Sequence, residues 1–330
     1  MIKISEAIPE RVLVTGGAGF IGSHLVDALI EAGRKVTVLD NMSNGNKIWL
    51  DTMTSKKNFS FFLGDIKDEN FVQSVMQSQQ QVWHLAGNAD IPLGINNTII
   101  DIDSAVYGTR NILNAMSQEG VKDIIFSSSG SVYGDLAKSK VAEECGPLYP
   151  LSMYAAGKIA AEAFISSYSN LFGICGWIFR FGNVLGSRMS RGAIRDFALR
   201  LDKDPSQLTI LGDGMQAKSY FLVEDCISGM VWLLSNYKMN YKQKVEIFNL
   251  GNDEVTSVVK IAECVANAMN LPNVSFNFKG GSTAWPGDQP VVHLDVSKVQ
   301  KLGWYPPNSS NEAVTVAVER MVTYLGLKKQ

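Results

Sequence analysis

The chain has 330 residues, of which 46% are hydrophobic and 19% are charged. This length and balance predict a globular protein with a large core, organised as one domain plus a smaller lobe. The formal net charge of −2 provides no basic footprint for nucleic acid or for an anionic membrane surface. No apolar run is long enough to cross a bilayer.

The four cysteines are far apart in the sequence, at positions 145, 175, 226 and 264. Their spacing matches no metal-ligand pattern, so we expect reduced thiols in a cytoplasmic protein that holds no metal. The three histidines are scattered as well, and we expect them to have packing or surface roles.

The most informative stretch near the start is a glycine-rich turn between a strand and a helix. An apolar segment at 11–14 precedes Thr-Gly-Gly-Ala-Gly-Phe-Ile-Gly at 15–22, and a helical pattern follows. Such a turn gathers backbone N–H groups and a positive helix end at one point, where a pyrophosphate binds. Gly16 permits the tight turn, Gly19 lets the backbone approach the phosphates, and Gly22 lets the helix pack against the strand.

A second strand at 35–39 ends in Asp40. A carboxylate at this position accepts both ribose hydroxyls of an adenosine and repels a 2′-phosphate. Asn41-Met42-Ser43 follows it, and not an arginine, which favours NAD over NADP. The alternative is a turn that only joins a strand to a helix, and it leaves Asp40 unexplained.

Strand and helix patterns alternate through the first half of the chain. Further strands are predicted at 59–63, 81–85, 124–126 and 176–180, with helices near 67–79, 104–119 and 152–172. This alternation predicts an α/β fold, a Rossmann-type doubly wound parallel sheet with helices on both faces. The ligand should lie at the carboxyl ends of the strands, where Gly16, Asp40, Asp65, Gly87, Ser129 and Asn183 fall. For Asp65 two roles stay open, namely a partner of the adenine amino group and an N-cap of the following helix.

From about position 184 the pattern changes to shorter strands with more Gly, Pro and Asn. Helices are predicted at 190–201, 224–236, 258–270 and 310–324, and strands at 208–211 and 219–223. We therefore divide the chain into a cofactor-binding domain, 1–183, onto which 224–252 packs back, and a smaller α/β substrate-binding lobe. That lobe is formed by 184–223 and 253–330.

The strongest catalytic signal is Tyr154 followed four residues later by Lys158. Positions i and i+4 share one helix face, and a nearby positive charge favours the phenolate. Such a phenol can act as a general base near neutral pH, with Ser129 hydrogen-bonding the same substrate hydroxyl. The alternative is a tyrosine and a lysine on a helix surface, which can have the same spacing without any catalytic role. The glycine-rich turn and the serine-rich strand end that precede this pair favour the catalytic interpretation.

Together these pieces resemble the extended short-chain dehydrogenases/reductases, and in particular the NAD-dependent sugar-nucleotide epimerase/dehydratase family. The matching segments are the glycine-rich turn and Leu-Asp-Asn (39–41), Gly-Asp-Ile (64–66), His-Leu-Ala-Gly (84–87), Ser-Ser-Ser-Gly-Ser-Val-Tyr-Gly (127–134), Tyr154 with Lys158, Arg-Phe-Gly-Asn-Val-Leu-Gly (180–186), Gly-Asp-Gly-Met-Gln-Ala-Lys-Ser-Tyr (212–220) and Trp-Pro-Gly-Asp (285–288). They extend over nearly the whole chain, and within the family they are most similar to the UDP-glucose 4-epimerases.

The resemblance implies an enzyme that uses NAD and acts on a nucleotide sugar, a UDP-hexose. The cofactor-binding residues that it implies are Gly16, Gly19, Phe20, Ile21, Gly22, Asp40, Asn41, Asp65, Ile66, Leu85, Ala86, Gly87, Tyr154 and Lys158. Ser129, Tyr154 and Lys158 would be catalytic, and Ser129, Tyr154, Asn183, Arg188 and Lys218 would bind the substrate. The resemblance also implies a homodimer, paired through the helices near 104–119 and 152–172.

The implied reaction is a transient oxidation at C4 of the sugar. Tyr154 removes the O4 proton and a hydride passes to NAD⁺, which leaves a 4-keto sugar. The sugar turns about its phosphate link and the hydride returns to the other face, so that C4 is inverted. A 4,6-dehydratase or a decarboxylase is the main alternative, but the residues after Ser129 include no carboxylate of the kind that those relatives have there. A 4-keto reductase and a non-catalytic NAD-binding regulator also stay open.

Two departures from the family pattern concern the substrate. Lys218 stands in place of an arginine that grips the diphosphate, and Trp285 stands in place of a second one. The indole can stack on a base or simply pack. Three arginines at 188, 191 and 195 are candidates for the missing charge, or they form a solvated basic helix face.

Overall fold

The computed structural model describes residues 4, 6–239 and 244–328. A sheet of seven parallel strands forms its centre, in the order β11-β6-β5-β4-β1-β2-β3. These strands are β1 (Arg11–Thr15), β2 (Lys35–Asp40), β3 (Phe59–Leu63), β4 (Gln81–His84), β5 (Asp123–Ser129), β6 (Cys175–Phe181) and β11 (Val245–Leu250). The strand order reverses between β1 and β4, and a doubly wound sheet binds its ligand beside such a point. The predicted Rossmann-type α/β fold is thus confirmed.

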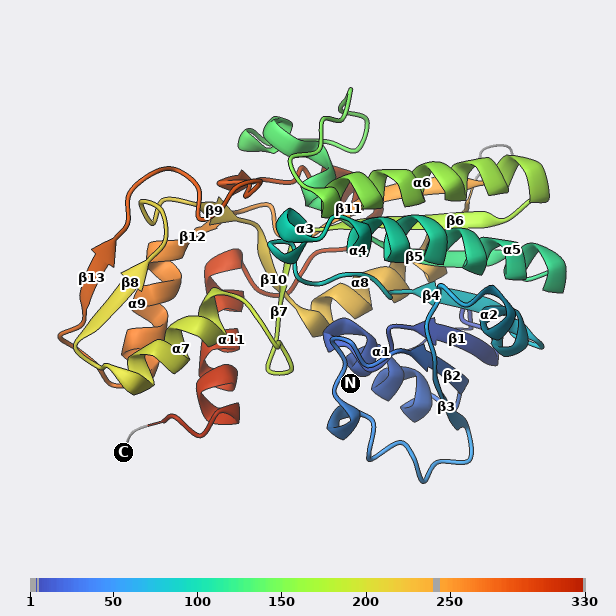
Figure 1. Cartoon of the computed structure of the whole chain (residues 1–330), viewed down its shortest axis with the longest axis horizontal. Coiled ribbons are helices and arrows are strands. Elements are labelled where there is room, and N and C mark those ends of the chain that lie inside the picture. Colours follow the sequence, from blue (N-terminus) through green and yellow to red (C-terminus); the bar gives the residue numbers. More distant parts are fainter. Residues whose placement is uncertain (1–3, 5, 240–243, 329–330) are drawn as a thin grey trace.

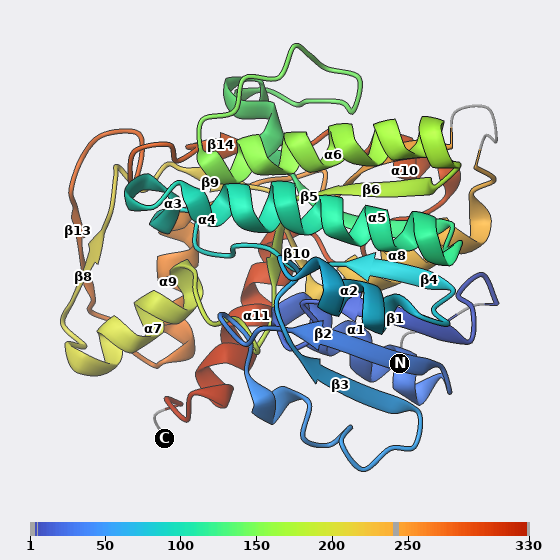
Figure 2. The same ribbon diagram turned by 45° about the vertical axis from the view of Figure 1, so that its right-hand side comes forward.

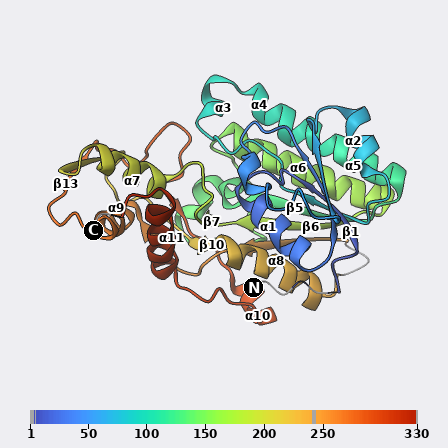
Figure 3. The same cartoon turned by 90° about the horizontal axis from the view of Figure 1, so that it is seen from below.

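Helices cover both faces of the sheet (Figures 1 and 3). One face carries α1 (Phe20–Glu31) and α8 (Val223–Asn236), and the other carries α2 (Glu69–Met76), α5 (Thr109–Glu119) and α6 (Met153–Phe172). Leu25, Val26 and Leu29 of α1 are fully buried, as the helical spacing of its apolar residues requires. The short α10 (Ser297–Leu302) packs beside β11.

The segment that precedes α5 differs from the single helix predicted at 104–119. It consists of α3 (Leu93–Asn96), α4 (Ile99–Asp101) and η2, a π-helix at Ile102–Gly108. A Cβ on Gly157 of α6 would be 2.8 Å from the Cβ of Ala105 in η2. The backbones of the two helices are therefore close together at this point. π-Helical turns are rare and occur often at functional sites, and this one borders the candidate site described below.

The remaining elements form the smaller unit in the left part of Figure 1 and are seen from another side in Figure 2. They include α7 (Ala193–Lys203), α9 (Val258–Ala268) and α11 (Ser310–Tyr324), with the paired strands β7 (Asn183–Leu185) and β10 (Tyr220–Leu222), β8 (Gln207–Ile210) and β13 (Ser275–Phe278), and the three-stranded set of β9 (Ala217–Lys218), β12 (Thr256–Ser257) and β14 (Val291–Val292). A separate apolar core lies among these helices and strands. Short η1 (Lys47–Trp49) and η3 (Gly130–Lys138) complete the described elements. The domain boundaries given above stay a prediction.

Three further observations concern the described residues alone. No helix among residues 4, 6–239 and 244–328 is long and apolar enough to span a membrane. Within the same ranges no group of three or more His, Cys, Asp or Glu side chains is arranged to hold a metal ion. The four cysteines are free thiols.

Candidate active site

A cavity of about 540 Å³ lies at the carboxyl ends of the central strands. Its lining includes all fourteen residues that were predicted to bind the cofactor: Gly16, Gly19, Phe20, Ile21, Gly22, Asp40, Asn41, Asp65, Ile66, Leu85, Ala86, Gly87, Tyr154 and Lys158. Residues from the carboxyl ends of β1 to β5, or from the loops just after them, and from α6 therefore converge on one space. The predicted substrate residues Ser129, Asn183, Arg188 and Lys218 are not part of that lining.

The glycine-rich turn packs too tightly for any side chain at two of its positions. A Cβ on Gly22 would be 2.1 Å from the carbonyl oxygen of Gly16, and a Cβ on Gly16 would be 2.7 Å from the amide nitrogen of Ala86. Gly16 also has a φ of +71°, which favours glycine. No side chain caps the start of α1, so its first N–H groups are open to an anion in the cavity.

Asp40 is fixed at the end of β2 by two backbone donors. Its carboxylate accepts from the N–H of Ala18 at 2.9 Å and from the N–H of Met42 at 2.8 Å. Burial raises the pKa of this carboxyl, while the two amide hydrogen bonds oppose the rise. The arrangement holds Asp40 in one orientation beside the glycine-rich turn, where a ribose would meet it.

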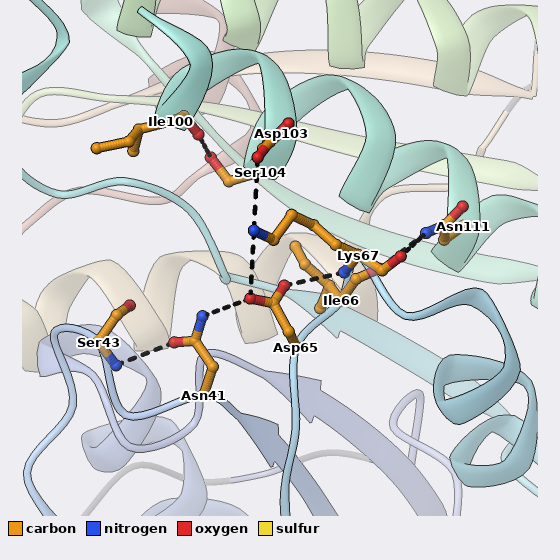
Figure 4. A network of polar contacts seen from close by, with 9 residues as sticks. All are labelled: Asn41, Ser43, Asp65, Ile66, Lys67, Ile100, Asp103, Ser104 and Asn111. Carbon is orange, nitrogen blue, oxygen red and sulfur yellow. Dashed lines mark hydrogen bonds and ion pairs between the residues drawn. The ribbon is translucent and has the colours of Figure 1, made fainter. Parts of the chain in front are cut away.

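A polar network borders the same end of the cavity (Figure 4). The side chain of Asn41 donates to Asp65 at 3.0 Å, and the Nζ of Lys67 lies 3.8 Å from Asp65 and 3.4 Å from Asp103 of η2. Asp65 accepts the backbone N–H of Lys67 at 2.9 Å and does not cap α2. Asp68 caps that helix, so the N-cap interpretation of Asp65 was wrong. Figure 4 shows Lys67 linking the loop after β3 to the π-helix.

The predicted catalytic side chains meet at the opposite side of the cavity, where β5 and α6 adjoin. The hydroxyl groups of Tyr154 and Ser129 share a hydrogen bond, and Ser129 also accepts from the N–H of Ser131 at 3.1 Å. The Nζ of Lys158 donates to the carbonyl oxygen of Ser127 at 2.6 Å and lies 5.7 Å from the centre of the Tyr154 ring. The spacing of four residues thus places tyrosine and lysine on one face of α6, as predicted.

The pKa shifts in this pair are governed by burial. Burial lowers the pKa of Lys158 to about 8, although the negative charges of Glu162 and Asp101 oppose this. Burial also raises the pKa of Tyr154, and the hydrogen bond from Ser129 only partly offsets that rise. Contrary to expectation, the positive charge of Lys158 alone does not lower the pKa of Tyr154 below its ordinary value. A phenolate at Tyr154 therefore needs additional positive charge in the cavity.

A buried charge network, which the sequence motifs did not predict, supports the same face of α6. The Nη2 of Arg180 on β6 lies 2.7 Å from Glu162, one turn after Lys158, and its Nη1 donates to the hydroxyl of Tyr133 at 3.0 Å. The hydroxyl of Ser128 also donates to Glu162. All four side chains are nearly inaccessible to solvent. The signal in the sequence was a glutamate one turn beyond Lys158, with an arginine on the next strand.

His84 at the end of β4 also has a structural position, as predicted. Its ring lies between the hydroxyls of Thr15 and Thr109, at 2.8 and 3.0 Å, and it is fully buried. Burial lowers the pKa of His84 to about 3, which keeps the ring neutral.

The predicted substrate residues lie near the smaller unit, and two of their charges have partners. Lys218 on β9 lies 3.2 Å from the carboxylate of Asp288 and 5.9 Å from the centre of the Trp285 ring. Arg188 lies 2.7 Å from Asp27 of α1. Asn183 begins β7 and donates its backbone N–H to Ser219 at 2.7 Å. Their roles in substrate binding stay predictions.

Comparison with known proteins gives consistent results. Residues 12–251 match the model of the "NAD dependent epimerase/dehydratase family". The chain is 33% identical to a putative UDP-glucose 4-epimerase of Methanocaldococcus jannaschii, over 94% of this chain and 98% of that protein. It is 32% identical to UDP-glucuronic acid decarboxylase 1 of Arabidopsis thaliana, over 92% of this chain and 68% of that protein.

A solved structure adds evidence on the fold and the cofactor. The UDP-glucose 4-epimerase of Thermus thermophilus, in complex with NAD, superposes with a TM-score of 0.81. That structure is 30% identical to this chain, and the match covers 94% of this chain and 98% of the other. The family model and this NAD complex together identify NAD as the cofactor of this chain's family.

Proposed function

This chain belongs to the NAD-dependent epimerase/dehydratase family, and we propose that it is a sugar-nucleotide 4-epimerase that inverts C4 of a UDP-hexose. The observation that carries the proposal is the distribution of carboxylates around the cavity. Among the described lining residues the acids are Asp40, Asp65 and Asp103, and all three belong to the end near β2, β3 and η2. The part of the lining near Tyr154 offers hydroxyls and an ammonium group, which suffice for reversible oxidation of an alcohol. The Asp101 carboxylate, whose charge acts on Tyr154 and Lys158, is buried and is not part of that lining.

The residues present fit NAD. The uncapped start of α1 suits the pyrophosphate, and Asp40 suits the adenosine ribose. A Cβ at Gly16 or Gly22 would collide with neighbouring backbone atoms, so these two positions of the turn require glycine. When bound, NAD supplies the hydride acceptor and donor and, in its oxidised form, a positive ring charge.

The roles of the side chains follow from their positions. Tyr154 takes the proton from the sugar O4 hydroxyl and later returns it to O4 on the other side of the ring. Ser129 holds the phenol and the same substrate oxygen in line through its hydroxyl. Lys158, fixed to the Ser127 carbonyl, places an ammonium group beside the phenol, where its charge would add to that of the oxidised cofactor in favouring the phenolate.

A decarboxylase of UDP-glucuronate is the second candidate, because the curated relative from Arabidopsis thaliana with 32% identity has that name. Loss of CO₂ or water requires an acid or base near C5 and C6 of the sugar. The residues that follow β5, from Gly130 to Gly134, include no carboxylate that could take this role. The two functions differ in their products, so one measurement separates them.

We also propose a homodimer, as the family resemblance implies. On the segments through which the resemblance pairs two copies, three large apolar side chains are exposed, namely Tyr107 of η2 and Leu171 and Phe172 at the end of α6. Exposed apolar side chains on helices favour association. Light scattering at micromolar concentration should give twice the mass of the chain, and a monomer would count against the proposal.

The experiment that tests the function is proton NMR of the purified protein with NAD⁺ and a panel of sugar nucleotides. The panel is UDP-glucose, UDP-N-acetylglucosamine, UDP-glucuronate and GDP- and dTDP-hexoses. We expect a new anomeric signal from the C4 epimer of a UDP-hexose, without net formation of NADH. Released CO₂ or a 4-keto-6-deoxy product would move the chain to the decarboxylases or dehydratases. The Tyr154→Phe variant, which should bind NAD but lose turnover by at least about a hundredfold, is the control for the site.

A further inference from the structure

The cavity contains one cationic side chain from the chain segment between β7 and α7. Among the described lining residues the cations are Lys67, Lys158 and Arg191. Lys67 is at the β3 end, between Asp65 and Asp103, and Lys158 is buried and bound to the Ser127 carbonyl. Arg191 alone approaches the cavity from the side of the smaller unit, two residues before α7.

Arg191 forms an ion pair with Asp90, a residue that is 101 positions away in the sequence. Asp90 lies in the loop after β4, between Ala89 and α3, and its own backbone is fixed by Asn88. The Asn88 side chain accepts from the Asp90 N–H at 2.8 Å and donates to the Asp90 carbonyl at 2.9 Å. The ion pair thus connects the loop of the central sheet with the segment that leads into α7, at the edge of the cavity.

The two partners differ in how firmly they are held. The Asp90 side chain is 19% exposed, and its second oxygen accepts the N–H of Leu93 at the start of α3, at 3.3 Å. The Arg191 side chain is 52% exposed. A half-exposed pair of this kind contributes little to stability, so an anion with better geometry can displace the carboxylate. A phosphate or carboxylate group of a ligand has this better geometry when it accepts two parallel hydrogen bonds from the guanidinium.

The two other cations predicted to bind the substrate are less available. Lys218 is paired with Asp288, whose side chain is only 3% exposed, and Arg188 is paired with Asp27. Neither lines the cavity. A substrate that carries a diphosphate needs positive charge in the cavity, and Arg191 is the half-exposed cation that enters the described lining from the side of the smaller unit.

We propose that Arg191 binds an anionic group of the incoming nucleotide sugar, its diphosphate or a C6 carboxylate, and that Asp90 holds the guanidinium at the cavity edge until that group replaces it. The inference rests on the proposed function and names a specificity-determining residue for it. Arg191 is one of three arginines that the sequence offered, and its place in the cavity lining distinguishes it from Arg188 and Arg195.

The test is isothermal titration calorimetry of the NAD-loaded protein with UDP, UDP-glucose and UDP-glucuronate. The variants are Arg191→Met, which removes the charge and keeps the length, and Asp90→Asn, which frees the guanidinium. Arg195→Met is the matched control, because it removes an arginine four residues further on, in α7, that does not line the cavity. NAD affinity is measured for each variant as a second readout.

We expect Arg191→Met to weaken binding by about tenfold or more, as loss of a charge-assisted hydrogen bond does, and Asp90→Asn to tighten it a few-fold. Weakening for UDP itself identifies the diphosphate as the bound group, and weakening for UDP-glucuronate alone identifies the carboxylate. Either result supports the proposal. NAD affinity should not change in any variant.

Three results would overturn it. Arg191→Met could bind all three ligands as the Arg195→Met control does, which would remove Arg191 from the substrate site. It could lose NAD affinity instead, which would assign the guanidinium to the cofactor. If the unaltered protein binds none of the three ligands, the proposed function fails and this inference fails with it, whereas the first two results leave the proposed function intact.

Discussion

The cofactor side of the cavity and the smaller unit beside it hold their charged side chains in different ways. On the cofactor side the polar partners are near one another in the chain: Asp40 is 22 positions from Ala18, and Asn41 is 24 positions from Asp65. On the side of the smaller unit the partners are distant. Lys218 and Asp288 are 70 positions apart, and Arg188 and Asp27 are 161 positions apart.

This difference has a physical consequence for binding. Asp40 is held by backbone N–H groups that belong to fixed turns, so the cofactor side is preorganised before any ligand arrives. Arg191 and Lys218 are held by other side chains, and a substrate anion must compete with a carboxylate to reach them. The cofactor side should therefore respond to substitution through stability and geometry, and the other side through affinity for the substrate.

The largest expected effect in the cofactor-binding region is that of Glu162→Gln. The side chains of Glu162 and Arg180 are 8% and 4% exposed, and removal of one partner leaves a buried guanidinium without its countercharge. We expect a loss of about 3–5 kcal/mol in the free energy of unfolding, measured by urea denaturation. Glu69→Gln, which breaks the exposed pair with Arg110, is the control and should cost less than about 1 kcal/mol. Equal losses in the two variants would show that the buried network contributes no more than a surface pair.

The next effect comes from the buried ammonium of Lys158. Its pKa is lowered to about 8 by burial, from an ordinary value of 10.5, so between these pH values the unfolded chain binds a proton that the folded chain does not. Stability from this group therefore rises as pH increases from 8 to 10.5, by on the order of 3 kcal/mol. Urea denaturation of the unaltered protein against pH, compared with Lys158→Met, isolates this contribution. The same pH slope in both proteins would contradict it.

Gly22→Ala tests the preorganised turn itself. The new Cβ would be 2.1 Å from the carbonyl oxygen of Gly16, so the turn must shift by a distance that the packed neighbours resist. We expect a cost of about 1–3 kcal/mol and at least a tenfold loss of NAD affinity. Gly33→Ala adds a methyl group with nothing within 4 Å, in a backbone of φ +77°, and should reduce stability without affecting NAD affinity. If Gly22→Ala binds NAD normally, the turn adapts more easily than its packing suggests.

The sequence predicted the central sheet well, because its buried strands are continuous apolar runs and its turn chemistry is local. It missed β11, whose charged and polar residues Glu246 and Asn249 interrupt the apolar run. Both have tertiary partners: Glu246 accepts from Lys298, and Asn249 accepts from the Tyr133 hydroxyl at 2.7 Å. A strand whose polar residues are satisfied by distant partners cannot be identified from its own pattern.

The residues of the candidate site divide in the same way, into those placed by a local pattern and those placed by partners that are distant in the chain. Tyr154 and Lys158 could be placed together because the helix repeat fixes their spacing, and Asp40 because it ends a strand beside the glycine-rich turn. The π-helix could not be predicted, because it accompanies the close approach of Ala105 to Gly157, which only the tertiary fold brings about. The ion pairs of Arg191 and Lys218 could not be predicted for the same reason, because the tertiary fold brings their partners together.

The smallest expected effect concerns Lys67, which links the loop after β3 to the π-helix at the edge of the cofactor cavity (Figure 4). Its side chain is 47% exposed, and its two carboxylate partners are 35% and 31% exposed, so solvent screens both pairs. Lys67→Met should reduce NAD affinity by only about two- to threefold at low salt and by less at high salt, because Asp65 keeps its hydrogen bonds from Asn41 and from the backbone N–H of residue 67. Titration of NAD at two salt concentrations measures this. A tenfold loss that persists at high salt would mean that the cofactor side, like the other, depends on a side chain which a distant partner holds in place.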